Sequence, residues 1–301
     1  MSTVPPGTSI SLCVVAKGGC DPAAFLTSLQ EQDFRIGAGV DVHLAHDEPL
    51  ADPAALDAAG WQLHRCGGQP SILRLWGTAI AASTQRYVVT MDVECPPDKG
   101  WWSTLLRELG TGTRVFTGPV APGWPPSEWM IVGYLVEYAQ FHRPHHPSVH
   151  EVPGINFACE RALLDSNDVL RERGWFKTFT LWRLAREQNI VASRCDEMQV
   201  VFRRNLEPGS FLRRRYLHGR CFGACRHQQP GQPPRWACVL FAPVLPVLRC
   251  ARVWRAAARH ADLRLAYWRQ LHWVVLSEIA WSWGEFLGYL LGAGDACDRL
   301  D

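Results

Sequence analysis

Short apolar runs alternate with helical patterns along the first third of the chain. Residues 9–16 (SISLCVVA) form an apolar run closed by Lys17-Gly18-Gly19, which is typical of a buried strand followed by a turn. Residues 22–32 carry apolar residues at helical spacing behind Pro22, which suits the first turn of a helix. The same reasoning predicts strands at 40–44, 61–64 and 87–91, and a helix at 72–83.

This alternation predicts an α/β fold with a mostly parallel sheet and helices on both faces. Beyond Asp92 the pattern is less regular, with helices expected at 101–109, 159–172 and 179–188 and a strand at 114–120. A Pro/Gly/Gln-rich linker at 228–234 precedes two strongly apolar segments. We expect these segments to form a C-terminal helical hairpin.

Composition excludes some classes of protein. Hydrophobic residues make up 47% of the 301 residues and charged residues 20%, which rules out a mostly disordered chain. Only Lys17, Lys99 and Lys177 are lysines among the 31 basic residues, and this arginine bias suggests a GC-rich bacterial genome. The net charge of +2 and the sparse aromatic residues within the arginine-rich stretch 203–226 argue against a nucleic-acid partner.

The eleven cysteines are spread along the chain without a C-x-x-C pair. Residues 1–9 are polar and Pro-rich, so we expect no secretory signal and a reduced, cytoplasmic location with free thiols. Cys221 and Cys225 stand four residues apart, but no His or Cys follows them at zinc spacing. We therefore expect no metal site at this pair.

Charged residues that could bind a ligand follow two of the predicted strands. In an open parallel sheet, ligands bind at the carboxyl ends of the strands. Ala16-Lys17 follows the first predicted strand, and Asp92-Val93-Glu94 follows the strand at 87–91. An Asp-x-Glu in this position offers oxygen ligands for Mg²⁺ or Mn²⁺ bridging a diphosphate. Taken alone, a D-x-E is a weak signal, because the same residues are more often a solvated turn.

The order of four segments resembles the family-2 glycosyltransferases over residues 9–226. These segments are SISLCVVA, GTAIAAS-x-x-RYVVTMDVECPP-x-x-GWWSTLL, VPGINFACERALL and SFLRRRYLHGRCFG, and the stretch 278–292 is similar to membrane-associated members. The resemblance implies a GT-A-like fold that moves a sugar from a nucleotide-sugar donor to a small-molecule or lipid acceptor in a biosynthetic pathway. It implies a nucleotide-sugar-binding half at 1–118, an acceptor-side half at 119–227 and an apolar helical segment at 228–301.

The resemblance also assigns roles to individual residues. Asp92 and Glu94 would hold the metal, with Asp92 counted among the catalytic residues. Asn156 and Trp101 would lie on the acceptor side. The residues expected to bind the nucleotide and its diphosphate are Ala16, Lys17, Asp41, Asp47, Arg214, Arg215 and Arg220.

The general base is expected among Lys177, His150 and Glu151. Lys177 stands where the family commonly has an acidic residue, and a lysine is protonated at neutral pH unless it is strongly desolvated. The AKGGC sequence after the first strand and Phe202 also depart from the family pattern. These departures keep a second hypothesis open: a transferase-like scaffold that acts as a binding subunit or catalyses a non-glycosyl reaction.

The apolar C-terminal segments leave two alternatives. Residues 237–248 are too short to span a bilayer, and residues 270–294 are long enough but carry Glu278 and Glu285. Arginines between the two segments suit an anionic surface, which predicts peripheral contact with the inner face of the membrane. The other alternative is a helical hairpin that packs on the catalytic body, or on a second subunit in a homodimer.

Overall fold

The structure is a computed structural model that describes residues 8–37, 39–123, 126–143, 151–164, 174–204 and 206–300. The chain divides into two compact units. The sheet unit holds the described residues of Met1–Ala121 and Arg143–Phe202, and the helical unit holds those of Pro122–His142 and Arg203–Asp301. The described residues of the arginine-rich stretch 203–226 belong to the helical unit.

The sheet unit is built on a seven-stranded sheet with the order β3-β2-β1-β4-β7-β5-β8. Strands β1 to β4 are parallel, and β7 is antiparallel to both β4 and β5. Two further strands, β6 and β9, form a small second sheet. The strands are β1 (Ile10–Ala16), β2 (Val40–His46), β3 (Gln62–Arg65), β4 (Tyr87–Asp92), β5 (Val115–Thr117), β6 (Val120–Pro122), β7 (Asn156–Glu160), β8 (Ser193–Arg194) and β9 (Val200–Phe202).

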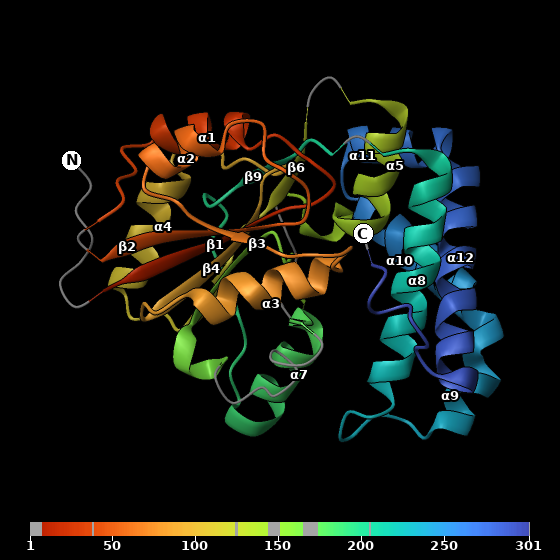
Figure 1. Ribbon diagram of the computed structural model, residues 1–301. Helices are drawn as coiled ribbons and strands as arrows, with labels where there is room; N and C mark the ends of the chain where they lie inside the picture. The colour runs from red at the N-terminus through yellow and green to blue at the C-terminus, as the bar shows by residue number, and fades with distance from the viewer. Residues whose placement is uncertain are drawn as a thin grey trace. The chain divides into compact units, whose positions relative to one another are not determined.

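Helices cover both faces of this sheet. Helices α1 and α2 lie on one face and α3 on the other (Figure 1). Residues of β1 and β4 are buried throughout, which explains why these strands are continuous apolar runs. The helices of the unit are α1 (Ala23–Gln30), α2 (Pro53–Ala58), α3 (Ile72–Ala82), α4 (Trp101–Gly110) and α7 (Lys177–Gln188).

The predicted α/β class and mostly parallel sheet are confirmed. The helix predicted for 159–172 is wrong over its described part, since 156–160 form β7 and Arg161–Leu163 form a 3₁₀ turn. A short apolar run such as NFAC cannot be assigned to helix or strand from periodicity alone. The strand predicted at 114–120 is divided into β5 and β6, with Gly118 and Pro119 between them.

The helical unit is larger than the hairpin predicted from the two apolar segments. Its helices are α5 (Glu128–Glu137), α8 (Pro208–Arg226), α9 (Arg235–Phe241), α10 (Leu245–Ala257), α11 (Ala261–Arg269) and α12 (Leu271–Leu291). Helices α8 and α12 run side by side in Figure 1. Their backbones meet at glycines: a Cβ on Gly219 or Gly223 would overlap the backbone of α12, and a Cβ on Gly284 or Gly288 would overlap that of α8.

Buried ion pairs join the same two helices. Arg215 of α8 donates to Glu278 of α12 at 3.0 Å, and Arg249 of α10 donates to the second oxygen of Glu278. Glu285 accepts from Trp281 at 2.9 Å and forms an ion pair with Arg226 at 3.3 Å. The two glutamates that argue against membrane burial of 270–294 thus face inward, and α12 is a core helix of its unit.

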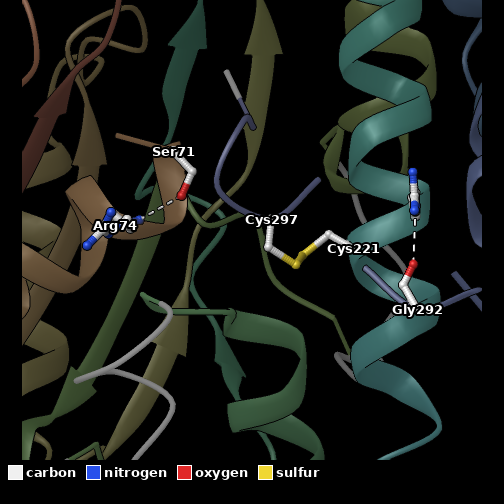
Figure 2. Close-up of a disulfide and its surroundings, with 6 residues drawn as sticks. Ser71, Arg74, Cys221, Gly292 and Cys297 are labelled. Atoms are coloured by element: carbon white, nitrogen blue, oxygen red, sulfur yellow. Dashed lines mark hydrogen bonds between the residues drawn. A yellow bond between two sulfur atoms is a disulfide. The ribbon is translucent and has the colours of Figure 1, made fainter. Parts of the chain in front are cut away.

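A disulfide joins Cys221 of α8 to Cys297, which follows α12 (Figure 2). The expectation that all cysteines are free thiols is therefore wrong for this pair. The pairing is possible because the chain after α12 folds back on α8 and brings the two Cα atoms within 4.9 Å.

The glycine contact between α8 and α12 predicts that Gly284→Ala destabilises the protein. An alanine in a helix interior is ordinarily favoured over glycine by about 1 kcal/mol. Here the new methyl group overlaps the Tyr216 carbonyl, and we expect a net loss of about 1–3 kcal/mol from overpacking. Urea unfolding followed by circular dichroism measures the change.

Gly209→Ala is the matched control. Gly209 lies in the first turn of α8, where an added Cβ meets no described atom within 4 Å. We expect this variant to be as stable as the parent chain or more stable. Equal stability changes in the two variants would contradict close packing at Gly284.

Candidate functional site

The order of the strands determines where a ligand can bind. The chain steps outward from β1 to β2 and β3, then returns to place β4 on the other side of β1. A crevice forms outside the carboxyl ends of strands where the order reverses in this way. Val15 of β1 is paired with Asp92 of β4, and Ala16 with His46 of β2. Neighbouring strands lie about 4.8 Å apart, so Lys17, Asp47 and Asp92 leave the sheet at one edge.

Lys17 and Asp47 form an ion pair at this edge. Lys17 Nζ lies 3.0 Å from Asp47 Oδ2, and it also donates to the Pro70 carbonyl at 2.8 Å. The amides of Gly18 and Glu48 each donate to Asp47 Oδ1 at 2.9 Å. Burial opposes ionisation of Asp47, but these hydrogen bonds and the Lys17 charge outweigh it and lower the pKa of the carboxyl. The pair therefore holds the turn after β1 in a defined shape.

The backbone conformation of the turn after β1 explains the two glycines of the AKGGC segment. Gly18 and Gly19 adopt φ values of +68° and +73°, a conformation that residues with a Cβ rarely adopt. The AKGGC segment thus forms a tight, polar turn after β1. Ala16 is the last residue of β1, and its side chain is buried.

Asp92 and Glu94 end β4 in a tight turn. The Glu94 amide donates to Asp92 Oδ1 at 2.9 Å, and the Cys95 amide donates to the Asp92 carbonyl at 2.8 Å. Asp92 is 8% exposed, whereas Glu94 is half-buried. Two carboxylates within one turn form an oxygen donor set of the kind that Mg²⁺ and Mn²⁺ accept, with the remaining positions open to phosphate oxygens and water. The residues present fit such an ion.

The segment after this turn is anchored to β9. The Val201 amide donates to the Pro96 carbonyl at 2.9 Å, and the Asp98 amide donates to the Gln199 carbonyl at 2.9 Å. These bonds fix the chain on the far side of the Asp-x-Glu. The carboxylates therefore lie between a buried strand and an anchored loop, on a rigid support.

The loop 151–155 lies beside β4. Thr90 Oγ1 donates to the Gly154 carbonyl at 2.6 Å, two residues before Asp92. Lys177, the first residue of α7, donates from Nζ to the Val152 carbonyl and packs against Gly154. Its amine thus holds the loop that carries Glu151, which is half-buried. His150 lies outside the described residues.

Asn156 and Trp101 do not form an accessible acceptor site. Both side chains are 0% exposed, and Trp101 Nε1 donates to Asn156 Oδ1 at 3.0 Å. Asn156 Nδ2 in turn donates to the carbonyls of Pro119 at 3.1 Å and Met198 at 2.6 Å. The acceptor-side prediction for both residues is corrected, because the amide uses its donors and acceptor to join β7 to α4 and to two loops.

Asp41 does not share an edge with Asp47. It is paired with Ser11 near the start of β1 and β2, at the amino ends of these strands. Its carboxylate accepts from Gln85 Nε2 at 2.9 Å and lies 3.2 Å from His43 Nε2. Burial lowers the pKa of His43, which favours the neutral imidazole. The nucleotide-binding prediction for Asp41 is therefore wrong.

The three arginines predicted to bind a diphosphate are engaged within the helical unit. Arg214 pairs with Glu137 at 3.0 Å and is 8% exposed, and Arg215 pairs with Glu278 and is 3% exposed. Arg220 Nε donates to the Gly292 carbonyl at 3.1 Å. Buried arginines in such pairs balance carboxylates that would otherwise be desolvated alone. Their predicted role is replaced by this structural one.

One contributor to the edge was missed by the sequence reasoning. The Pro70 carbonyl accepts a hydrogen bond from Lys17 and lies just before Ser71, the N-cap residue of α3. The Ser71 side chain caps this helix by accepting from the Arg74 amide at 3.3 Å (Figure 2). The amino end of α3 therefore adjoins the Lys17 turn. A serine preceding an apolar helical run is a start signal that sequence alone offers.

Comparison with known proteins finds the fold but no close relative. No family model matches the chain, and no curated protein matches it. Among solved structures, it is similar to a mannosyltransferase from Pyrobaculum calidifontis in complex with GDP-Man and Mn²⁺. The TM-score is 0.52 and the identity 15%, covering 98% of this chain and 88% of that one.

A second similar structure is glucosyl-3-phosphoglycerate synthase from Mycobacterium tuberculosis in complex with Mn²⁺, UDP and glucosyl-3-phosphoglycerate. The TM-score is 0.51 and the identity 14%, covering 77% of this chain and 83% of that one. The two matches confirm the predicted GT-A-like glycosyltransferase fold.

The geometry around Asn156 predicts that Asn156→Ala loses stability. Its removal leaves the buried Trp101 N–H without its acceptor and the Met198 carbonyl without its Asn156 donor, while the Pro119 carbonyl still accepts from the Val200 amide. Each unsatisfied buried group costs about 1–3 kcal/mol, so we expect a loss of more than 2 kcal/mol. Urea unfolding measures it, with Asn189→Gly as the control, because Asn189 ends α7 at φ 52°, where glycine is favourable. A stable Asn156→Ala protein with only a raised KM would restore the acceptor-side role.

Proposed function

We propose that this chain is a metal-assisted glycosyltransferase that moves a sugar from a nucleotide-diphosphate donor to a small-molecule or lipid acceptor. One observation carries the proposal. The acidic pair Asp92/Glu94 ends the strand next to β1, at the reversal of strand order, and Lys17 and Asp47 leave the same edge. The similar structures were determined with Mn²⁺ and with GDP-Man or UDP, which supports this class of donor.

Each polar group at this edge has a proposed role. Asp92 and Glu94 hold Mg²⁺ or Mn²⁺, which supplies positive charge to the leaving diphosphate. The Lys17-Gly18-Gly19 turn and Asp47 border the nucleotide. The backbone of this turn is shaped by the Lys17–Asp47 ion pair, and its glycines allow close approach of a ligand.

Glu151 is the described group that we assign to proton removal from the acceptor. Its loop is held beside β4 by Thr90 and by Lys177. The Lys177 amine donates to the Val152 carbonyl, which makes it a positioning residue for this loop. A carboxylate on a loop held beside β4 is a chemically suitable base.

The alternative is a transferase-like scaffold that has lost sugar transfer. It is favoured by the turn after β1, where Lys17 neutralises the carboxylate expected to meet the nucleotide. Such a scaffold would act as a binding subunit or use the crevice for a non-glycosyl reaction. Nucleotide binding separates the two functions.

Thermal melting with nucleoside diphosphates and nucleotide sugars, with and without Mn²⁺, tests the donor site. A ligand that binds only the folded chain stabilises it by about 2.7 kcal/mol at a hundredfold excess over its Kd. We expect a Mn²⁺-dependent rise in Tm for one nucleotide. Asp92→Asn should remove the Mn²⁺ dependence and lower transfer about 100-fold or more, as loss of a charge-stabilising group does.

Asp41→Asn is the matched control, because Asp41 lies at the opposite end of the same sheet. This variant should keep the nucleotide-dependent shift. If the Tm of the chain is the same with every nucleotide, the glycosyltransferase proposal is excluded and the scaffold alternative is favoured. Unchanged transfer by Asp92→Asn would exclude its metal role.

We also propose that the helical unit contacts an anionic membrane surface peripherally, on its cytoplasmic side. Large apolar side chains are exposed on its helices, including Trp236 (70%), Val247 (68%) and Trp283 (57%). The helical run Arg235–Ala257 is long and apolar enough to cross a membrane by length and composition, and 17% of its apolar window is buried. Exposed arginines on α10 and α11 supply the complementary charge to anionic lipid: Arg252, Arg255, Arg264 and Arg269.

Vesicle sedimentation tests this contact. We expect binding to vesicles that contain anionic phosphatidylglycerol, weakened by salt, and lost in the double variant Leu240→Ser/Phe241→Ser. Val191→Ser, an exposed apolar position of the sheet unit, is the control and should bind like the parent. Resistance to carbonate washing would contradict peripheral contact in favour of insertion. A stable dimer that ignores vesicles would assign the apolar face to a second copy.

A further inference from the structure

Three cysteines converge in the helical unit. Cys221 and Cys225 are one turn apart on the same side of α8, and Cys297 approaches them from the segment after α12. The three sulfur atoms all lie within 4.8 Å of one another. Figure 2 shows Cys297 reaching across to Cys221 to form the disulfide. The third cysteine of this cluster, Cys297, lies 76 positions after Cys221. A search for metal ligands at short sequence spacing therefore does not find it.

The approach of Cys297 does not depend on the disulfide alone. Arg220 donates to the Gly292 carbonyl at the start of the returning segment. Ala296 and Leu300 flank Cys297 and are buried at 0% and 1% exposure. The Asp298 amide donates to the Asp295 carbonyl at 3.1 Å and closes a turn around it. The segment is therefore folded against α8 by contacts that remain when the sulfur–sulfur bond is opened.

The arrangement matches the needs of a thiolate-bound metal ion. A Zn–S bond of about 2.3 Å with tetrahedral angles puts neighbouring sulfurs about 3.8 Å apart. The three sulfurs lie close enough to take up this separation once the Cys221–Cys297 bond is opened and its two sulfurs move apart. Cys221 is buried, whereas Cys225 and Cys297 are half-buried, so an ion can enter from solvent and keep a solvent ligand in its fourth position.

We propose that Cys221, Cys225 and Cys297 form a zinc site in the reduced chain, and that the Cys221–Cys297 disulfide is its oxidised, metal-free form. A phosphine reductant converts the disulfide into the two thiols: it gives two electrons to the sulfur–sulfur bond and becomes a phosphine oxide, with water supplying the oxygen and the two thiol protons. Zn²⁺ then displaces the thiol protons and binds the thiolates. This soft, sulfur-rich site is chemically distinct from the carboxylate pair Asp92/Glu94.

The site would have a defined structural effect. Either the disulfide or the metal ties the segment from Gly292 to Leu300 to α8. Only the reduced, metal-free chain lacks a covalent or coordinate link there. The stability of the helical unit therefore depends on the redox state and the metal together.

Cobalt titration of the full chain tests the proposal. The protein is reduced with tris(2-carboxyethyl)phosphine, freed of reductant without oxygen, and titrated with Co²⁺. We expect one equivalent to produce the near-ultraviolet thiolate-to-cobalt charge-transfer band, which Zn²⁺ then abolishes. Binding at Asp92/Glu94 gives no such band, because those ligands are oxygens. The result is thus independent of the proposed glycosyl transfer.

Variants separate the zinc site from other thiols. Cys225→Ser should weaken Co²⁺ binding at least tenfold, while alkylation and mass analysis of the oxidised protein still find the Cys221–Cys297 disulfide, which shows that the fold is intact. Cys250→Ser, a half-buried cysteine of α10, is the control and should bind like the parent. A reduced parent chain without the band, or a Cys225→Ser chain with parental affinity and an intact disulfide, would overturn the proposal.

Discussion

The parallel pairing of β1 with both β2 and β4 is the constraint on which the candidate site depends. The paired register brings the ends of these strands level, and the strand order reverses at β1, where ligands bind in open parallel sheets. Lys17, Asp47 and Asp92 follow or end neighbouring strands at this edge without being close in sequence. The ends of the strands thus supply the polar groups, while the buried strands supply a rigid support for the proposed site.

The helical unit follows a different physical rule. Glycine-to-backbone contact lets α8 and α12 approach closely, and this closeness brings Glu278 and Glu285 against arginines. Trp281 is covered by the guanidinium groups of Arg215 and Arg249 at 4.4 and 4.3 Å from its ring centroid. Each of these desolvated carboxylates needs its arginine partners for the unit to be stable, because a lone buried charge is strongly destabilising.

Local pattern was sufficient for the parts of the chain whose structure is local. The strands β1, β2 and β4 and the helix α3 follow from apolar runs and turn residues, and the strand ends identify Lys17 and Asp92. The roles of Arg215, Asn156 and Cys221 are different, because each depends on a partner far along the chain: Glu278, Met198 and Cys297. A single sequence carries no local mark of such a partner. An arginine that pairs with a buried carboxylate therefore looks the same as one that awaits a phosphate.

The close contact of α8 and α12 also has a genetic consequence. Every amino-acid replacement that one base change in a glycine codon can produce adds a Cβ. At Gly219, Gly223, Gly284 and Gly288 that atom meets the backbone of the neighbouring helix, which has no rotamer with which to move aside. At these four positions no amino-acid replacement reached by one base change keeps the helices at their present separation. In evolving copies of this chain they should drift only after the helix pair itself has been rebuilt.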